Sequence, residues 1–108
     1  MYETSGDILK LSLLMGDILE GKISRNKNFY TLAKAKDYYR FKRAKLLLSL
    51  VEDLNRTIEV PGNEIGTHHQ SDHVEVFLYN PSLKYNRRVI LSEPELELVA
   101  KQTRIKLN

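Results

Sequence analysis

The stretch "FYTLAKAKDYYRFKRAKLLLSLVEDLNR", residues 29–56, decides the fold, because it contains neither proline nor glycine. Alanine and leucine, which are strong helix formers, recur along it, so the sequence predicts one long helix. At about 1.5 Å per residue this helix would extend roughly 42 Å. A compact domain of similar chain length has a diameter of about 34 Å. We therefore expect the helix to break near its start, to project at one end, or to be covered by a second subunit.

Six of the 17 basic residues of the protein lie between residues 34 and 45 of this predicted helix. These six are Lys34, Lys36, Arg40, Lys42, Arg43 and Lys45. The whole chain has a net charge of only +3, yet residues 25–45 hold eight basic residues against the single acid Asp37, a local sum of +7. Charge that is segregated in this way makes a strong local field. The pattern predicts a contact surface for a polyanion, for an acidic protein or for a neighbouring subunit.

These cations are not confined to one side of the predicted helix. When the leucine face of residues 46–54 is extended backwards on a helical wheel, it reaches Lys36, Arg40 and Arg43. A solvated helix flank would place its cations opposite the leucines, so this segment is expected either to project or to meet a charged partner. In one interpretation the cations contact phosphates and the neighbouring tyrosines stack on unpaired bases. In the other, the aromatic residues belong to the core and the basic side chains lie over them.

A shorter helix is predicted before the long one. Ser5 or Thr4 can cap its start, Asp7 suits the positive end of the helix dipole, and Gly21 ends it. Apolar residues recur at three- and four-residue steps, with further leucines beside them. These residues are Ile8, Leu9, Leu11, Leu13, Leu14, Met15, Ile18 and Leu19. The apolar face is therefore broader than one partner helix would cover.

The C-terminal half of the chain changes to a period of two. Residues 57–60 are β-prone, residues 73–79 and 84–91 predict an antiparallel pair of strands, and residues 61–72 read as a loop. Ser92 can cap a short helix that has Pro94 in its first turn. The sequence therefore predicts an α+β fold: a two-helix hairpin with a long second helix, followed by a small antiparallel β-sheet and a short C-terminal helix. We expect residues 1–108 to form a single domain.

Two arginines and three histidines are further candidates for a binding site. Arg87 and Arg88 are neighbours on a predicted strand and must face opposite ways, so at most one can join the basic helix. His68, His69 and His73 gather in "THHQSDH". In a helical turn, His68 with Asp72 and His69 with His73 would be spaced like ligands of a divalent metal. Two of the histidines near a cation could also serve as acid and base in RNA cleavage. The surrounding glycine, serine and threonine instead favour a polar loop. We assign no metal, no cofactor and no catalytic residue.

The composition sets limits on the class of protein. The chain is 42% apolar and 29% charged, which is the balance of a soluble globular protein. No apolar run approaches the roughly 18 residues of a membrane span. The absence of cysteine excludes disulfides and thiolate sites. The first ten residues lack the basic start of an export signal, so we expect a cytoplasmic protein.

We predict a small non-enzymatic protein that binds nucleic acid, or a regulatory module, through the six cations of residues 34–45. The alternative is a protein–protein interaction adaptor whose helix docks an acidic partner, and a histidine-loop nuclease comes third. We also expect a homodimer. One small sheet can cover only one side of the helices, and leucines such as Leu13, Leu48 or Leu50 would otherwise face water.

Overall fold

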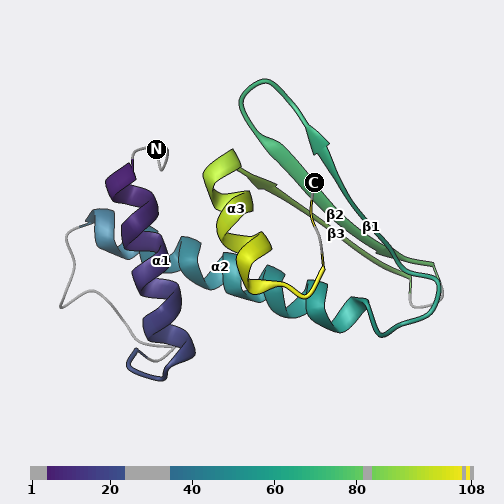
Figure 1. Ribbon diagram of the computed structural model, residues 1–108, viewed down its shortest axis with the longest axis horizontal. Coiled ribbons are helices and arrows are strands. Elements are labelled where there is room, and N and C mark those ends of the chain that lie inside the picture. The colour runs from purple at the N-terminus through teal and green to yellow at the C-terminus, as the bar shows by residue number, and fades with distance from the viewer. Residues whose placement is uncertain (1–4, 24–34, 82–83, 106, 108) are drawn as a thin grey trace. The chain divides into compact units, whose positions relative to one another are not determined.

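The computed structural model describes residues 5–23, 35–81, 84–105 and 107 (Figure 1). In chain order the elements are α1 (Ser5–Leu19), α2 (Ala35–Thr57), β1 (Glu64–His69), β2 (Val74–Asn80), β3 (Tyr85–Leu91) and α3 (Glu93–Gln102). The order of two helices, an antiparallel sheet and a final helix confirms the predicted α+β fold. In the part of the chain that is described, no helix is both long and apolar enough to span a membrane.

The chain divides into two compact units, residues 1–48 and residues 49–108, and the boundary lies inside α2. The first unit contains α1 and the first part of α2. The second unit contains the end of α2, the sheet and α3. The expectation of one domain over residues 1–108 stays a prediction.

The first unit has an apolar core and one buried ion pair. Its buried apolar residues are Leu11, Met15 and Ile18 on α1 and Phe41, Ala44, Leu47 and Leu48 on α2. The guanidinium of Arg40 donates to the carboxylate of Asp7, which ties α2 to α1. Asp7 is 7% exposed and Arg40 is 8% exposed. A buried charge is tolerated only when it is paired, so each of these residues depends on the other.

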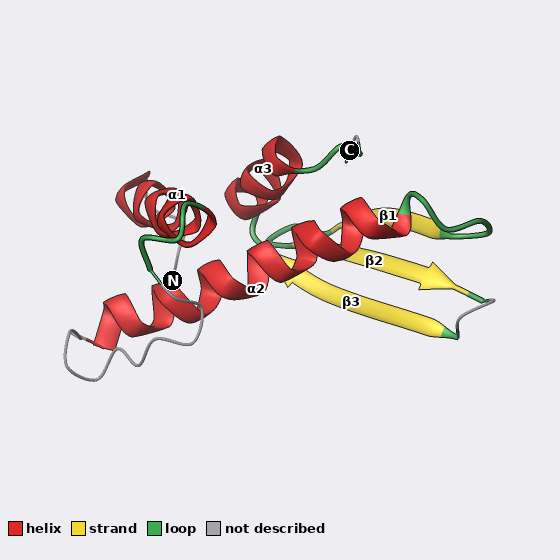
Figure 2. Cartoon of the chain, turned by 90° about the horizontal axis from the view of Figure 1, so that it is seen from below, coloured by secondary structure: helices red, strands yellow, loops and turns green. Residues whose placement is uncertain are grey.

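The second unit is built on a three-stranded antiparallel sheet in the order β1-β2-β3 (Figure 2). Alternate residues of the sheet point to opposite faces, and we call the buried face the inner face. Its fully or almost fully buried residues are Val74, Val76, Leu78, Val89 and Leu91. Leu50 and Leu54 of α2 and Leu96 and Val99 of α3 are buried as well. These side chains make up the core of the second unit.

Polar contacts fix α2 against this sheet and against α3. Arg87 of β3 donates to the Ser49 hydroxyl at 3.1 Å and to the Asp53 carboxylate, so the inner face lies toward the end of α2. The Asn55 side chain accepts from the backbone N–H of Arg104 at 2.8 Å, just after α3 ends. The end of α2 is thus held by β3 and by the segment that follows α3.

The start of α3 agrees with the sequence. The Ser92 hydroxyl accepts from the backbone N–H of Glu95 at 3.3 Å, and the Glu95 carboxylate accepts from the backbone N–H of Ser92 at 2.9 Å. This reciprocal capping box satisfies two backbone donors at the start of the helix, and Pro94 lies in the first turn.

Two expectations for the middle of the chain are wrong. Residues 57–60 are not a strand, because α2 continues to Thr57 and turns follow. The Asn63 amide donates to the carbonyls of Thr57 and Val60, the latter at 2.8 Å, and so satisfies backbone acceptors where the helix ends. Residues 61–72 are not a continuous loop, because residues 64–69 form β1 and pair with β2 along its length.

The expected exposure of leucines is only partly correct. Leu48 is 1% exposed and Leu50 is fully buried, so neither faces water as predicted. Leu13 is 59% exposed, as expected. The predicted cap Thr4 and the predicted first residues of the long helix, 29–34, lie outside the described residues. The described part of α2 is 23 residues long, which corresponds to roughly 35 Å.

The Asp7–Arg40 pair gives a stability prediction. The Arg40→Met substitution leaves the Asp7 carboxylate buried without this cation, and we expect it to lower the free energy of unfolding by about 3–5 kcal/mol. The double variant with Asp7→Leu should recover much of that loss, because no uncompensated charge remains. Urea denaturation followed by circular dichroism measures both. A single variant that is as stable as the wild-type protein would contradict the structural role of the pair.

Candidate functional site

The structure gives the six predicted cations of the long helix different environments. Lys34 lies outside the described residues, and of Lys36 only the helical backbone is described. Arg40 is buried against Asp7. The Lys42 side chain is exposed. The remaining two, Arg43 and Lys45, are half-buried.

Two of these lysines lie over aromatic rings of the same helix. The Lys42 ammonium is 5.0 Å from the ring centroid of Tyr38, and the Lys45 ammonium is 5.2 Å from that of Phe41. Phe41 belongs to the core of the first unit, whereas Tyr39 is exposed. A cation over a ring contributes about 0.5–1 kcal/mol at an exposed site, enough to favour one position of the ammonium. For Phe41 this arrangement agrees with the interpretation in which basic side chains cover core aromatic residues.

The second candidate surface is the outer face of the sheet, opposite the buried one. Residues that are directly paired across antiparallel strands share a face, so the register defines three rows from β1 through β2 to β3. The rows are Glu64, Tyr79 and Asn86; Gly66, Phe77 and Arg88; and His68, Glu75 and Ile90. Aromatic residues therefore occupy two adjacent rows of the central strand.

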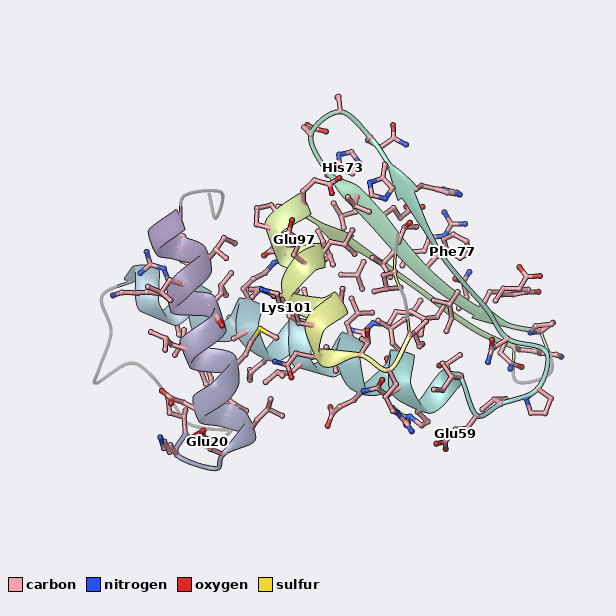
Figure 3. The ribbon with its side chains drawn as sticks, in the orientation of Figure 1. Glu20, Glu59, His73, Phe77, Glu97 and Lys101 are labelled. Carbon is pink, nitrogen blue, oxygen red and sulfur yellow. The ribbon has the colours of Figure 1, made fainter. Side chains whose placement is uncertain are left out.

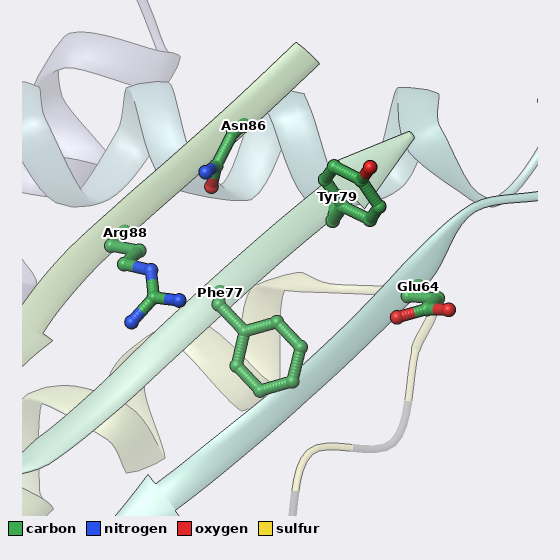
Figure 4. Close-up of a pocket in the computed structure, with 5 residues that line it drawn as sticks. All are labelled: Glu64, Phe77, Tyr79, Asn86 and Arg88. Carbon is green, nitrogen blue, oxygen red and sulfur yellow. The ribbon is translucent and has the colours of Figure 1, made fainter. Parts of the chain in front are cut away.

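The first two rows form an open cavity of about 280 Å³ (Figure 4). Its lining residues are Glu64, Phe77, Tyr79, Asn86 and Arg88. The ring of Phe77 leans over Gly66 of β1, where an added Cβ atom would lie 2.6 Å from the ring atom Cζ. Glycine at position 66 therefore permits the ring to lie directly on the backbone of the neighbouring strand.

The charged side chains of this outer face are partly paired. Arg88 donates to the Glu75 carboxylate at 3.1 Å. His68 lies 3.6 Å from the same carboxylate, and its ring centroid is 5.2 Å from that of Phe77. As the sequence required, Arg87 points the other way, toward Asp53. The outer face thus combines aromatic surface with one guanidinium and two carboxylates, those of Glu64 and Glu75.

The three histidines do not form one site. His68 and His69 are successive residues of β1 and point to opposite faces of the sheet. His69 lies 2.9 Å from a carboxylate oxygen of Glu93, and His73, near the turn between β1 and β2 (Figure 3), lies 2.6 Å from one of Asp72. Among the residues that the structure describes, no group of three or more potential ligands is arranged to hold a metal ion.

Sequence reasoning missed the outer face because its first strand was assigned to a loop. The alternation in "VEVFLYN" does place Phe77 and Tyr79 on one face of a strand. The cavity also needs Glu64 and Gly66, which join it only through the pairing of β1 with β2. Comparisons with known proteins give no further guidance, since no protein family, no curated protein and no solved structure matches the chain.

Proposed function

We propose that this protein is a non-enzymatic nucleic-acid-binding module, with phosphate contacts from Lys34, Lys36, Lys42, Arg43 and Lys45. Arg40 is left out of the contact set, because its charge is used in the core against Asp7. The observation that carries the proposal is the position of Lys42 and Lys45 on the first part of α2. Lys42 is exposed, with its ammonium over the half-buried ring of Tyr38, and Lys45 is half-buried, with its ammonium over the core ring of Phe41.

The charge of each unit supports this assignment. Residues 1–48 contain ten basic and five acidic residues, a net charge of +5. Residues 49–108 contain seven basic and nine acidic residues, a net charge of −2. The two sums recover the total of +3. A polyanion is therefore attracted to the first unit, and the strength of that attraction falls with salt.

The spacing along α2 favours a continuous contact line. Tyr38, Lys42 and Lys45 are separated by four and three residues, so they follow one face of the helix. An extended phosphate backbone can follow such a line, and Tyr39 adds an exposed ring beside it. Nothing in this arrangement requires a cofactor.

The sequence also suggests two alternative functions, an interaction adaptor and a histidine-loop nuclease. An acidic protein partner would use the same lysines and would make the protein an interaction adaptor. A histidine-loop nuclease is not proposed, because His68 and His69 point to opposite faces and cannot act on one phosphate. The cytoplasmic location stays a prediction.

We propose further that the protein is a homodimer that pairs through α1. Leu9, Leu13 and Leu19 are each more than half exposed. In an antiparallel pairing centred between residues 12 and 13, Leu9 would face Gly16 of the second copy and Leu13 would face Ser12. Gly16 has open space around its Cα, with no atom within 4 Å of an added Cβ. Large residues thus oppose small ones, which favours a second copy of this chain as the occupant.

Salt dependence tests the nucleic-acid proposal. Fluorescence polarisation with a labelled single-stranded RNA over a salt series should give a linear log–log plot. The double variant Lys42→Ala, Lys45→Ala should reduce its slope by about 0.7 for each lost phosphate contact. The matched control Lys22→Ala, Lys101→Ala removes two exposed lysines elsewhere and should leave the slope unchanged. No binding at ~50 mM salt, or equal slopes for wild type and the α2 variant, would reject the proposal.

Light scattering tests the dimer. The Leu13→Asp substitution places a charge in the centre of the proposed interface and should yield a folded monomer, since exposed substitutions usually change stability by less than about 0.5 kcal/mol. Gln70→Asp adds the same charge at an exposed turn and should leave the mass unchanged. A wild-type protein that runs as a monomer at high micromolar concentration would show that α1 does not self-associate.

A further inference from the structure

We propose that the cavity on the outer face of the sheet binds one unpaired nucleobase, with guanine preferred. The inference rests on the proposed function and specifies its ligand as single-stranded nucleic acid. The cavity belongs entirely to the second unit, so it is a site separate from the lysines of α2.

The aromatic residues supply the stacking surface. Phe77 and Tyr79 are two residues apart on the central strand, so their rings lie on the same face in adjacent rows (Figure 4). Tyr79 is exposed and Phe77 is half-buried. Every base has a flat aromatic face that stacks on such rings, and only an unpaired base can present it.

The size of the cavity limits the ligand. Its volume of about 280 Å³ lies just below the range of roughly 300–1,000 Å³ that is typical of pockets for drug-sized molecules. A single base is smaller than such a molecule and fits this volume, whereas a base pair within a duplex does not expose its faces. The cavity is therefore suited to one base of a flexible strand.

Two charged groups on opposite sides of the rings favour guanine. Glu64 on β1 can only accept hydrogen bonds when it is ionised, and Arg88 on β3 can only donate them. Guanine carries N–H donors at N1 and N2 on one edge and the acceptors O6 and N7 on the other. Adenine has no O6 acceptor, and it carries an amino group at that position. The Asn86 amide can both donate and accept, so it completes the edge contacts without choosing a base.

The ion pair of Arg88 with Glu75 does not prevent Arg88 from donating to a base edge. Arg88 has five N–H donors, and the contact with Glu75 uses one terminal nitrogen. The pair is exposed on the Arg88 side, and pairs of that kind contribute only about 0–1 kcal/mol. A base edge can therefore replace or share this contact at small cost.

The net charge of the outer face argues against a phosphate as the occupant. Glu64 and Glu75 provide two carboxylates against the single guanidinium of Arg88. A phosphate would be repelled by that sum, whereas a neutral base would not. The outer face is thus suited to a base, whereas the lysines of α2 are suited to phosphates.

Gly66 positions the ring that would carry the base. Because a Cβ at this position would lie 2.6 Å from Cζ and 2.8 Å from Cε1 of Phe77, the Gly66→Ala substitution must displace the ring. It does so without removing any group that lines the cavity. The Gly66→Ala variant therefore tests whether binding depends on the position of the Phe77 ring, since the ring itself is retained.

Fluorescence polarisation with two single strands of equal length and charge tests the base site. We expect the wild-type chain to bind an alternating uridine–guanosine RNA several times more tightly than the uridine–adenosine RNA, and a duplex more weakly than either. Phe77→Leu and Tyr79→Leu keep apolar bulk but remove a ring, and each should weaken single-strand binding by roughly five- to hundredfold. Glu64→Gln replaces a charged acceptor with a neutral one and should reduce the guanosine preference while leaving uridine–adenosine binding intact.

Matched variants control for general damage to the sheet. Ile90→Leu alters an exposed apolar residue of the same face that does not line the cavity, and its affinities should equal those of the wild type. Gly66→Ala should weaken single-strand binding while preserving the salt slope. Ring variants that bind single strands and duplex as the wild type does would overturn the base site, even if the salt dependence upheld the proposed function.

A second titration separates the two proposals. In NMR spectra of the isotope-labelled full chain, guanosine monophosphate at millimolar concentration should shift signals of β2 and β3, whereas ribose 5-phosphate should not. Equal shifts with both compounds would mean phosphate binding only, and no shift in the sheet would overturn the base site. If Tyr79→Leu changes the mass of the protein and not these shifts, the outer face is a protein interface and the inference fails.

Discussion

The second unit depends on one constraint: successive side chains of the central strand β2 alternate between a buried and a more exposed face of the sheet. Val74, Val76 and Leu78 are fully buried on one side, so α2 and α3 must cover that side. The alternation then leaves Phe77 and Tyr79 on the opposite side. No described element of the second unit covers that outer face, which is why its aromatic residues line an open cavity.

In the first unit the corresponding constraint is electrostatic. Arg40 lies on the side of α2 that continues the leucine face, and it is accommodated there by the buried carboxylate of Asp7. An unpaired charge at this position would be costly, so the pair selects one arrangement of α1 on α2. Of the other described cations in the segment, Lys42 is exposed, and Arg43 and Lys45 are half-buried. Burial and pairing with Asp7 thus give Arg40 a structural role in this basic segment.

The sequence predicted those parts of the fold that depend on local signals. Helix α1, the β2–β3 pair and the capped start of α3 follow from caps, turns and alternation over a few residues. Strand β1 escaped prediction because it lies at the edge of the sheet, where its polar histidines and Gly66 show no apolar alternation. The role of Arg40 also could not be predicted, because its partner is 33 positions away along the chain.

The candidate sites also differ in whether they depend on local sequence or on contacts between distant residues. The run of six cations in residues 34–45 is visible in the sequence, but the burial of Arg40 among them is not. The outer-face cavity depends on the register of three strands, since Glu64, Phe77 and Arg88 come from separate parts of the chain. The alternation of residues 74–80 alone indicates that two aromatic rings share one face. The cavity, and the positions of Glu64 and Arg88 beside those rings, become apparent only from the pairing of the three strands.

Photocrosslinking of the full chain to a guanosine-containing single-stranded RNA, followed by mass spectrometry of the crosslinked peptides, tests the central claim most directly. That claim is that an unpaired base stacks on the outer face of the sheet. We expect base adducts on Phe77 or Tyr79 and their loss when a duplex replaces the single strand. Adducts confined to residues 1–56, or adducts that form equally with the duplex, would contradict it.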